Sequence, residues 1–148
     1  MSGGRSPKDG RGRTARIARK TRETAIDLSL ALDRDAGNGA PNSIRTPVEF
    51  MNHMLELLAA HGGFGLRIRA TGDVGVDDHH VVEDLGIVLG QALTKALGDK
   101  KGIRRYGHAL VPMDESLVRV ALDLSGRAHL AYNLVLSGKR IKTFETAL

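Results

Sequence analysis

Cysteine and tryptophan are absent from this sequence of 148 residues, and aromatic residues make up only 3% of it. Without cysteine the chain has neither a disulfide scaffold nor a thiolate metal site, and it is compatible with a reducing compartment. No apolar run approaches the roughly 18–20 residues of a membrane-spanning helix, and the N-terminus lacks the apolar segment of a secretory signal. We therefore predict a cytoplasmic protein with no membrane partner and a core of aliphatic side chains.

Positive charge is concentrated near the N-terminus. The formal net charge is +5, yet residues 1–22 hold eight Lys and Arg against one acid, whereas the remaining residues hold 14 basic and 16 acidic side chains. The body of the protein is therefore close to neutral. Because a nucleic-acid-binding surface needs a basic stripe on the folded body, we do not expect nucleic acid as a partner.

Alternation of apolar and polar residues predicts a series of strands, since side chains along a strand point to opposite faces in turn. We expect strands at residues 15–19, 26–32, 66–70, 107–111, 117–125 and 130–136. The stretch DRDAGNGAPNS at 33–43 is dense in turn-forming residues and predicts a loop.

Apolar residues at three- and four-residue steps predict helices. We expect helices at 46–61 and 79–97 and the start of another at 144–148. Thr46 suits the N-cap of the first helix, Pro47 suits its first position, and Glu49 would complete a capping box. Gly98 suits the residue that follows the end of the second helix.

A weak internal repeat is present, because residues 25–33 and 118–125 share one apolar pattern. This predicts a tandem of two α/β units. We place the first unit at 14–102 and a second, incomplete unit at 103–148. Residues 1–13 are rich in Gly, Ser and Arg and predict a flexible basic tail.

The most informative stretch is DDHHVVED, which begins at Asp77. On a helix, His79 and Glu83 are four residues apart and His80 and Glu83 are three apart, so the three side chains lie within one turn. Two imidazoles and a carboxylate in this arrangement suit a divalent metal ion. Asp77 or Asp78 could cap the helix or hold a ligand imidazole. The alternative interpretation is a solvated polar helix start that binds nothing.

Another histidine, His53, lies on the predicted helix at 46–61, three residues after Phe50 and four before Leu57. It could belong with the metal ligands, or it could be a residue at the edge of the core. The other histidines form no comparable cluster in the sequence.

Several stretches together resemble the imidazoleglycerol-phosphate dehydratase family of histidine biosynthesis. They are RKTRET (19–24), NHML (52–55), GDVGVDDHHVVED (72–84), GIVLG (86–90), GDKKGIRRYG (98–107), VPMDE (111–115) and LDLSGR (122–127). Their shared order along the chain, from about residue 14 to the end, makes the resemblance specific.

The resemblance implies a two-layer α/β fold in which each repeat is a four-stranded sheet backed by two helices. It implies a homo-oligomer in which trimers assemble into an octahedral cage, with active sites between subunits. It also implies two manganese ions, Mn²⁺, in each complete site. The substrate would be a small phosphorylated imidazole, imidazoleglycerol phosphate, which this lyase family dehydrates to imidazoleacetol phosphate.

The resemblance also implies roles for individual residues. The family's metal ligands correspond to His53, His79, His80 and Glu83. Glu23 corresponds to the acid/base carboxylate that contacts the substrate, a role that suits a positioned carboxylate. Arg105 and Arg127 correspond to phosphate-binding groups, and the planar fork of a guanidinium suits that task. Neutral imidazoles and carboxylates are ligands that Mn²⁺ accepts.

The sequence departs from the family pattern in three places. Asn52 stands where the family usually has aspartate, and Thr46-Pro47-Val48 replaces a glycine-bearing stretch. The resemblance also implies a further histidine, a second His-His-x-x-Glu motif and a phosphate-contacting lysine beyond Leu148. We therefore expect a truncated reading, a fragment of a longer protein, or a subunit completed by a partner, and a chain that is inactive unless the missing ligands are supplied.

Two other functions remain open at this point. The chain could be a catalytically silent assembly or interaction protein that keeps the fold, which metal binding at the site would distinguish. It could also be a metal-dependent hydrolase that uses the first four ligands alone, which would act on simple phosphate esters without an imidazole.

Overall fold

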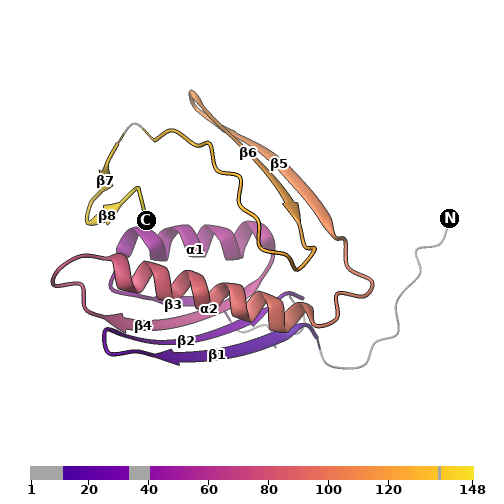
Figure 1. Ribbon diagram of the computed structural model, residues 1–148, viewed down its shortest axis with the longest axis horizontal. Coiled ribbons are helices and arrows are strands. Elements are labelled where there is room, and N and C mark those ends of the chain that lie inside the picture. Colours follow the sequence, from indigo (N-terminus) through magenta and orange to yellow (C-terminus); the bar gives the residue numbers. More distant parts are fainter. Residues whose placement is uncertain (1–11, 34–40, 137) are drawn as a thin grey trace. The chain divides into compact units, whose positions relative to one another are not determined.

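The computed structural model describes residues 12–33, 41–136 and 138–148. Along these residues the chain forms two helices and eight strands (Figure 1). In order, these are β1 (Thr14–Lys20), β2 (Thr24–Ala31), β3 (Ser43–Arg45), α1 (Glu49–Gly62), β4 (Gly65–Gly72), α2 (His79–Leu97), β5 (Tyr106–Met113), β6 (Ser116–Asp123), β7 (Arg140–Ile141) and β8 (Phe144–Glu145). Neither helix is long and apolar enough to cross a membrane within this described part of the chain.

The chain divides into two compact units. One comprises Met1–Gly98 together with Leu136–Leu148, and the other comprises Asp99–Val135. The sequence-based assignment of residues 14–102 and 103–148 to two repeats stays a prediction.

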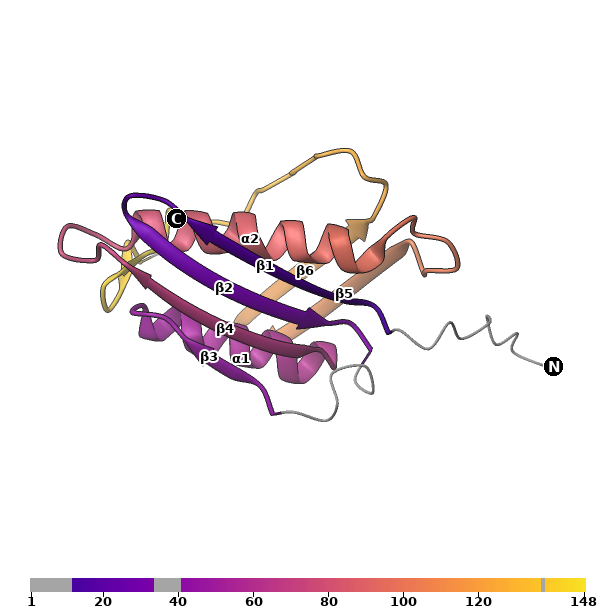
Figure 2. The same ribbon diagram turned by 90° about the horizontal axis from the view of Figure 1, so that it is seen from below.

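The first unit is built on a four-stranded sheet of order β1-β2-β4-β3, seen from its helix-free face in Figure 2. β2 pairs antiparallel with both β1 and β4, so that Leu28 lies opposite Ile17 on one side and Ile68 on the other. β3 runs parallel to β4 at the edge. The strands predicted from alternation near 15–19, 26–32 and 66–70 are confirmed. β3 is missing from the prediction, because three residues are too few for alternation to show.

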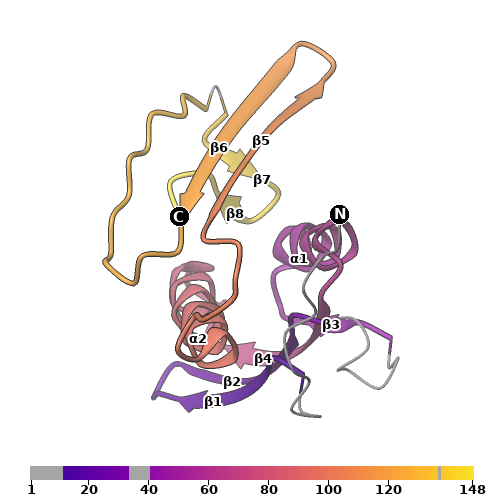
Figure 3. The ribbon, with the colours of Figure 1, turned by 90° about the vertical axis from the view of Figure 1, so that its right-hand side faces the viewer.

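One face of this sheet forms the core. Ile26, Leu28 and Leu30 of β2 are buried, as are Leu66 and Ile68 of β4. Both helices lie on this face (Figure 3), α2 against β1 and β2 and α1 against β3. The helices contribute Leu55, Ala59, Leu85, Val88, Ala92 and Ala96 to the core. The two-layer α/β unit expected from the sequence is therefore confirmed.

The start of α1 differs from the prediction. Glu49 is the first helical residue, and Val48 occupies the N-cap position without a side-chain hydrogen bond, so the capping box expected from Thr46 does not form. The Thr46 hydroxyl instead accepts the Val48 N–H at 3.1 Å. Val48 has an extended backbone, with φ −102° and ψ 95°, so the helix begins two residues after Pro47 instead of at it. The predicted ends of α2 are confirmed, and Gly98 follows it with a φ of 56°.

The second unit contains one antiparallel hairpin, in which Val111 of β5 lies opposite Val118 of β6. β5 continues through Pro112 to Met113, beyond the predicted 107–111. The strand predicted at 130–136 is wrong, since no strand forms there. Alternation alone suggested it, but a strand also needs a paired neighbour for its backbone groups.

The C-terminal residues form a small hairpin, in which Ile141 of β7 pairs with Phe144 of β8. The helix start predicted at 144–148 is therefore wrong, because five residues cannot establish a helical period. The hairpin contacts α1 twice. The Phe144 ring lies 5.2 Å from that of Phe50, between centroids, and Lys142 Nζ lies 2.6 Å from Glu49 Oε2.

Candidate active site

The first turn of α2 presents three of the predicted metal ligands to solvent. His79 Nε2 and Glu83 Oε2 lie 3.3 Å apart, and both side chains are more than half exposed. The His80 ring lies edge-on to the His79 ring, with centroids 5.8 Å apart. The helical spacing therefore gathers two imidazoles and a carboxylate on one accessible turn.

Two aspartates shape the start of this turn. The His79 N–H donates to Asp77 Oδ1 at 2.9 Å, which is the capping interaction expected from one member of this pair. Asp78 is only 5% exposed, and its Oδ2 has no hydrogen-bond partner among the described residues. A buried carboxylate oxygen without a partner costs free energy. This oxygen is therefore free to accept a hydrogen bond.

The predicted acid/base carboxylate lies in the turn between β1 and β2. Glu23 is exposed, and its backbone is held on both sides. Its N–H donates to Thr21 Oγ1 at 3.2 Å, and its carbonyl accepts the Asp73 N–H at 2.9 Å. An accessible carboxylate on a restrained backbone suits a group that transfers protons.

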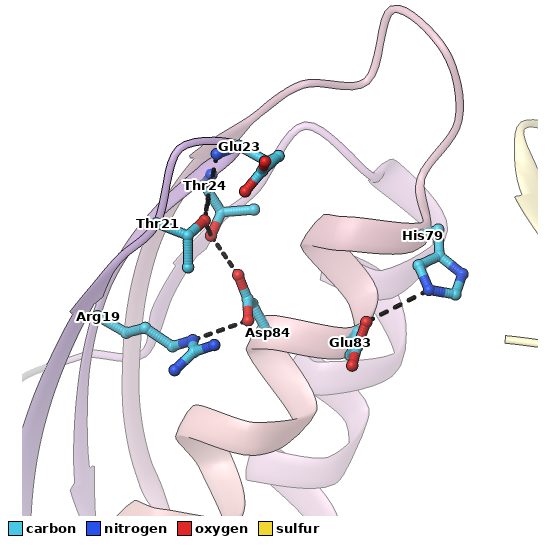
Figure 4. Close-up of polar contacts among 7 residues, drawn as sticks. All are labelled: Arg19, Thr21, Glu23, Thr24, His79, Glu83 and Asp84. Atoms are coloured by element: carbon cyan, nitrogen blue, oxygen red, sulfur yellow. Dashed lines mark hydrogen bonds and ion pairs between the residues drawn. The ribbon is translucent and has the colours of Figure 1, made fainter.

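A buried polar network connects this turn to α2 (Figure 4). Thr24 Oγ1 donates to Asp84 Oδ2 at 2.5 Å, and Arg19 Nε donates to Asp84 Oδ1 at 2.7 Å. Burial acts to raise the pKa of Asp84, but the hydrogen bonds from Thr24 and Arg19 outweigh it, so the pKa lies below its usual range. Asp84 is therefore ionised at neutral pH.

β4 approaches α2 closely just before the ligand turn. A Cβ placed on Gly72 would lie 2.4 Å from Val81 Cγ2, a separation that real side chains do not adopt. Val81 itself is fully buried. Glycine at position 72 therefore allows the end of β4 to pack directly beneath the turn that carries His79 and His80.

His53 lies on the exposed side of α1. Across residues 12–33, 41–136 and 138–148, no three His, Asp or Glu side chains converge as a metal site requires. The structure thus places His79, His80 and Glu83 on one turn without bringing His53 or any other ligand to a common point with them.

The residue before His53 is held to the start of the helix. Asn52 Oδ1 accepts the Thr46 N–H at 2.9 Å, and Asn52 Nδ2 donates to the Thr46 carbonyl at 3.0 Å. The two departures from the family pattern near this helix, Asn52 and the segment around Thr46, are therefore in direct contact.

The predicted phosphate-binding arginines lie around one carboxylate of the second unit. Arg105 donates to both oxygens of Asp123, from Nε at 2.6 Å and from Nη2 at 2.9 Å. The hydrogen bond from Arg105 holds the pKa of Asp123 below its usual range, and the charges of Arg127 and Lys100 act in the same direction. A Cβ on Gly126 would lie 2.6 Å from Lys100 Nζ. Glycine at position 126 therefore leaves room for the end of the Lys100 side chain. Three cations therefore gather at the end of the β5–β6 hairpin.

Comparison with known proteins gives a match to the family model described as imidazoleglycerol-phosphate dehydratase, over residues 46–148. The chain belongs to this family.

Curated dehydratases align along almost the whole chain. The chain is 56% identical over 136 residues to imidazoleglycerol-phosphate dehydratase of Geobacter sulfurreducens and 54% identical over 134 residues to that of Limosilactobacillus fermentum. These alignments cover 92% and 90% of the chain and 68% and 67% of the relatives. The crystal structure of imidazoleglycerol-phosphate dehydratase from Staphylococcus aureus matches with a TM-score of 0.77 at 42% identity, covering 90% of this chain and 71% of that one. The chain thus spans about two thirds of the length of these curated dehydratases.

Two features of this dehydratase-family chain escape sequence reasoning. The contact between Thr24 and Asp84 joins residues 60 positions apart, and Lys100 reads in the sequence as an ordinary turn residue. The sequence could have pointed to Thr24, Asp84 and Lys100 in one way, since all three fall within the stretches that resemble the dehydratase family.

Proposed function

We propose that this chain dehydrates imidazoleglycerol phosphate to imidazoleacetol phosphate in histidine biosynthesis, as a manganese-dependent hydro-lyase. The observation that carries the proposal is the exposed His79–Glu83 pair on the first turn of α2, in a chain that belongs to the dehydratase family. Relatives that share more than half of its residues carry the name of this activity, which supports the assignment.

The side chains on α2 fit part of a manganese site. Imidazole nitrogens and a carboxylate oxygen are ligands that Mn²⁺ accepts, and the unpartnered Asp78 Oδ2 could orient one of the imidazoles. Because three ligands do not converge within the described residues, we propose that His53 and ligands from a partner subunit complete the coordination. When bound, Mn²⁺ would supply Lewis-acid stabilisation of negative charge on the substrate's imidazole ring.

The chain's own residues would bind the substrate and move its proton. Glu23 would accept the proton from the carbon adjacent to the one that loses its hydroxyl group, and the proton and the hydroxyl leave as water. The enol that remains becomes the ketone of imidazoleacetol phosphate when its hydroxyl proton moves to the neighbouring carbon. Arg105 and Arg127 would bind the phosphate through paired N–H donors. Since Arg105 already donates to Asp123, the phosphate would share this guanidinium with that carboxylate.

Metal binding tests the ligand assignment directly. Mn²⁺ titrations followed by electron paramagnetic resonance should show binding by the 148-residue chain and at least about tenfold weaker binding by His80→Ala. His61→Ala is a matched control, because His61 is an exposed histidine in the last turn of α1. Equal Mn²⁺ affinity in His80→Ala and His61→Ala would remove His80 from the ligand set.

Turnover tests the activity itself. The purified chain should dehydrate imidazoleglycerol phosphate when Mn²⁺ is added and should lose this activity when a chelator is present. Arg127→Ala should raise KM, whereas Arg104→Ala, which changes an exposed arginine beside the site, should not. A folded, manganese-loaded chain without turnover would reject the proposed activity for this chain and favour an assembly role.

A further inference from the structure

Thr24 and Asp84 form a buried hydrogen bond between the β1–β2 turn and α2. Thr24 is 4% exposed and Asp84 is 7% exposed, and Thr24 Oγ1 lies 2.5 Å from Asp84 Oδ2. The second carboxylate oxygen accepts Arg19 Nε. Each oxygen of this buried charge therefore has a partner, one from β1 and one from β2.

The charge on Asp84 fixes the proton positions in the network. An ionised carboxylate can only accept, so the Thr24 hydroxyl must donate to it. The Thr21 hydroxyl, 3.1 Å from Thr24 Oγ1, must then donate to Thr24. Thr21 Oγ1 in turn accepts the backbone N–H groups of Glu23 and Thr24 at 3.2 and 2.9 Å. A directed chain of hydrogen bonds thus runs from the backbone of Glu23 to the carboxylate on α2, and such chains strengthen each member.

This bond lies one residue away from each of two proposed functional carboxylates. Glu23 immediately precedes Thr24, and Glu83 immediately precedes Asp84. Figure 4 shows Asp84 directed toward the β1–β2 turn, while Glu83 meets His79 on another side of the helix. One contact therefore joins the backbone that carries Glu23 to the helical turn that carries Glu83.

Stability alone does not account for such a network. A buried charge costs several kcal/mol in desolvation, and well-packed apolar residues in its place are often at least as stable. The hairpin is already held by the β1–β2 and β2–β4 ladders. The hydrogen bonds of the Glu23 backbone run to Thr21 and Asp73, so they tie the turn to itself and to the end of β4, and neither of them reaches α2.

We infer that Thr24 and Asp84 are positioning residues, whose hydrogen bond sets the place of Glu23 relative to the His79–Glu83 turn. This inference rests on the proposed function for the roles of Glu23, His79 and Glu83. The bond itself takes no part in the chemistry and contacts no substrate. It acts by joining the turn that carries Glu23 to α2 through the Thr24 side chain.

Amide hydrogen exchange tests the positioning without any metal. In Thr24→Val, the N–H groups of Glu23 and Asp73 should exchange about tenfold faster or more, because the turn loses its hold on α2, while Leu28 in mid-strand is unchanged. Thr24→Ser keeps the hydroxyl and should restore slow exchange. Asp84→Asn keeps the side-chain volume and should also speed amide exchange at Glu23 and Asp73. It serves as the test variant if Thr24→Val does not fold.

Asp27→Asn is the matched control for this experiment. Asp27 is paired with Arg16 on the same two strands, at 2.9 Å to Nε, and this pair lies between β1 and β2 without involving α2. Its loss should leave exchange at Glu23 unchanged. Equal exchange at Glu23 in wild type and Thr24→Val, or equal acceleration by Asp27→Asn, would overturn the inference.

Paramagnetic broadening by bound Mn²⁺ then links the positioning to the site. Broadening of the Glu23 side-chain carboxyl carbon falls steeply with its distance from the metal, so Thr24→Val should weaken it while retaining Mn²⁺ affinity, and Thr24→Ser should restore it. Undiminished broadening in Thr24→Val would overturn the inference. Absence of Mn²⁺ effects on His79 in the wild type would instead reject the ligand assignment. The exchange experiment would still show whether the Thr24–Asp84 bond holds the β1–β2 turn to α2.

Discussion

The contact between Asn52 and Thr46 predicts a pH-dependent response to the substitution Asn52→Asp. The Asn52 amide uses both of its ends, accepting the Thr46 N–H at 2.9 Å and donating to the Thr46 carbonyl at 3.0 Å. A carboxylate at this position could still accept the N–H. Its second oxygen, however, would face the carbonyl oxygen without a proton between them.

The size of the effect follows from these contacts. Loss of the hydrogen bond, with the carbonyl left facing a negative charge, should cost about 2 kcal/mol. A carboxylate in the first turns of a helix gains about 0.5 kcal/mol from the helix dipole. We therefore expect Asn52→Asp to lower the free energy of unfolding by about 1.5 kcal/mol at pH 7, since the dipole offsets only part of the loss.

The loss should disappear in acid. Once protonated, the introduced carboxyl group can donate to the Thr46 carbonyl, as the amide does, so folding raises its pKa above the unfolded value of about 3.9. A group with a raised folded pKa contributes stability below the unfolded pKa, and this contribution is lost as the pH rises through the folded pKa. The difference between wild type and Asn52→Asp should therefore be small at pH 3.5 and reach its full size by pH 7.

Urea denaturation of both proteins at pH 3.5 and pH 7 measures this difference. Asn42→Asp is a matched control, because the Asn42 side chain accepts the Leu66 N–H at 2.8 Å and a carboxylate can accept it equally well. Asn42→Asp should change the free energy of unfolding by less than about 0.5 kcal/mol at pH 7. An equal cost for the two substitutions, or a cost of Asn52→Asp that persists at pH 3.5, would refute the reasoning.

Three further predictions concern the fold around the site. Gly72→Ala should lower the free energy of unfolding by about 1–3 kcal/mol, because its Cβ would meet Val81 at 2.4 Å, and Val81→Ala in the same protein should relieve part of that cost in a double-mutant cycle. Leu28→Ala should lower it by about 3 kcal/mol in urea denaturation, since Leu28 is fully buried. The side-chain and backbone hydrogen bonds from Arg13 lower the pKa of Asp33 to about 2, so this pair stabilises the fold above about pH 3.9. That contribution is about 1 kcal/mol, because both side chains are partly exposed, and it is lost as the pH falls toward 2. In thermal unfolding measured over a series of pH values, Asp33→Asn should lack this part of the loss of stability in acid.

The regular parts of the first unit were within reach of sequence reasoning. In β2, buried residues alternate with half-buried ones from Thr24 to Leu30, so a period of two directly reports the strand. The period of α2 likewise reports its buried face, and the predicted ends of this helix agree with the structure. Both signals are local, because the spacing of apolar residues within one strand or helix is enough to predict which of its faces is buried.

The irregular parts depended on information from elsewhere in the chain. β3 forms because Ser43 and Arg45 pair with Arg67 and Arg69 of β4. A strand of three residues is too short for its own sequence to predict this pairing. The segment at 130–136 alternates without a paired neighbour, and it is not a strand. Pairing is a property of two segments, whereas alternation is a property of one, and this difference accounts for both errors.

The same distinction applies to the candidate site. The approach of His79 and Glu83 follows from helical spacing and could be predicted. The partner of Asp84 could not, because Thr24 lies on another element. Nor does the sequence reveal that Arg105 pairs with Asp123, since that contact depends on the register of the β5–β6 hairpin.

Two side-chain contacts have the same relation to the proposed chemistry. Asn52 holds the Thr46 backbone and immediately precedes His53, while Thr24 holds Asp84 and immediately follows Glu23. Both contacts lie at junctions, between β3 and α1 or between β1 and β2, where the regular pairing of the strands has ended. A side chain that bonds across such a junction substitutes for the missing ladder, and hydrogen bonds are directional where apolar contacts are not. If His53 and Glu23 have the roles proposed above, these polar groups should affect both stability and the placement of the neighbouring residue. Conservative variants, rather than deletions of apolar volume, then separate the two effects.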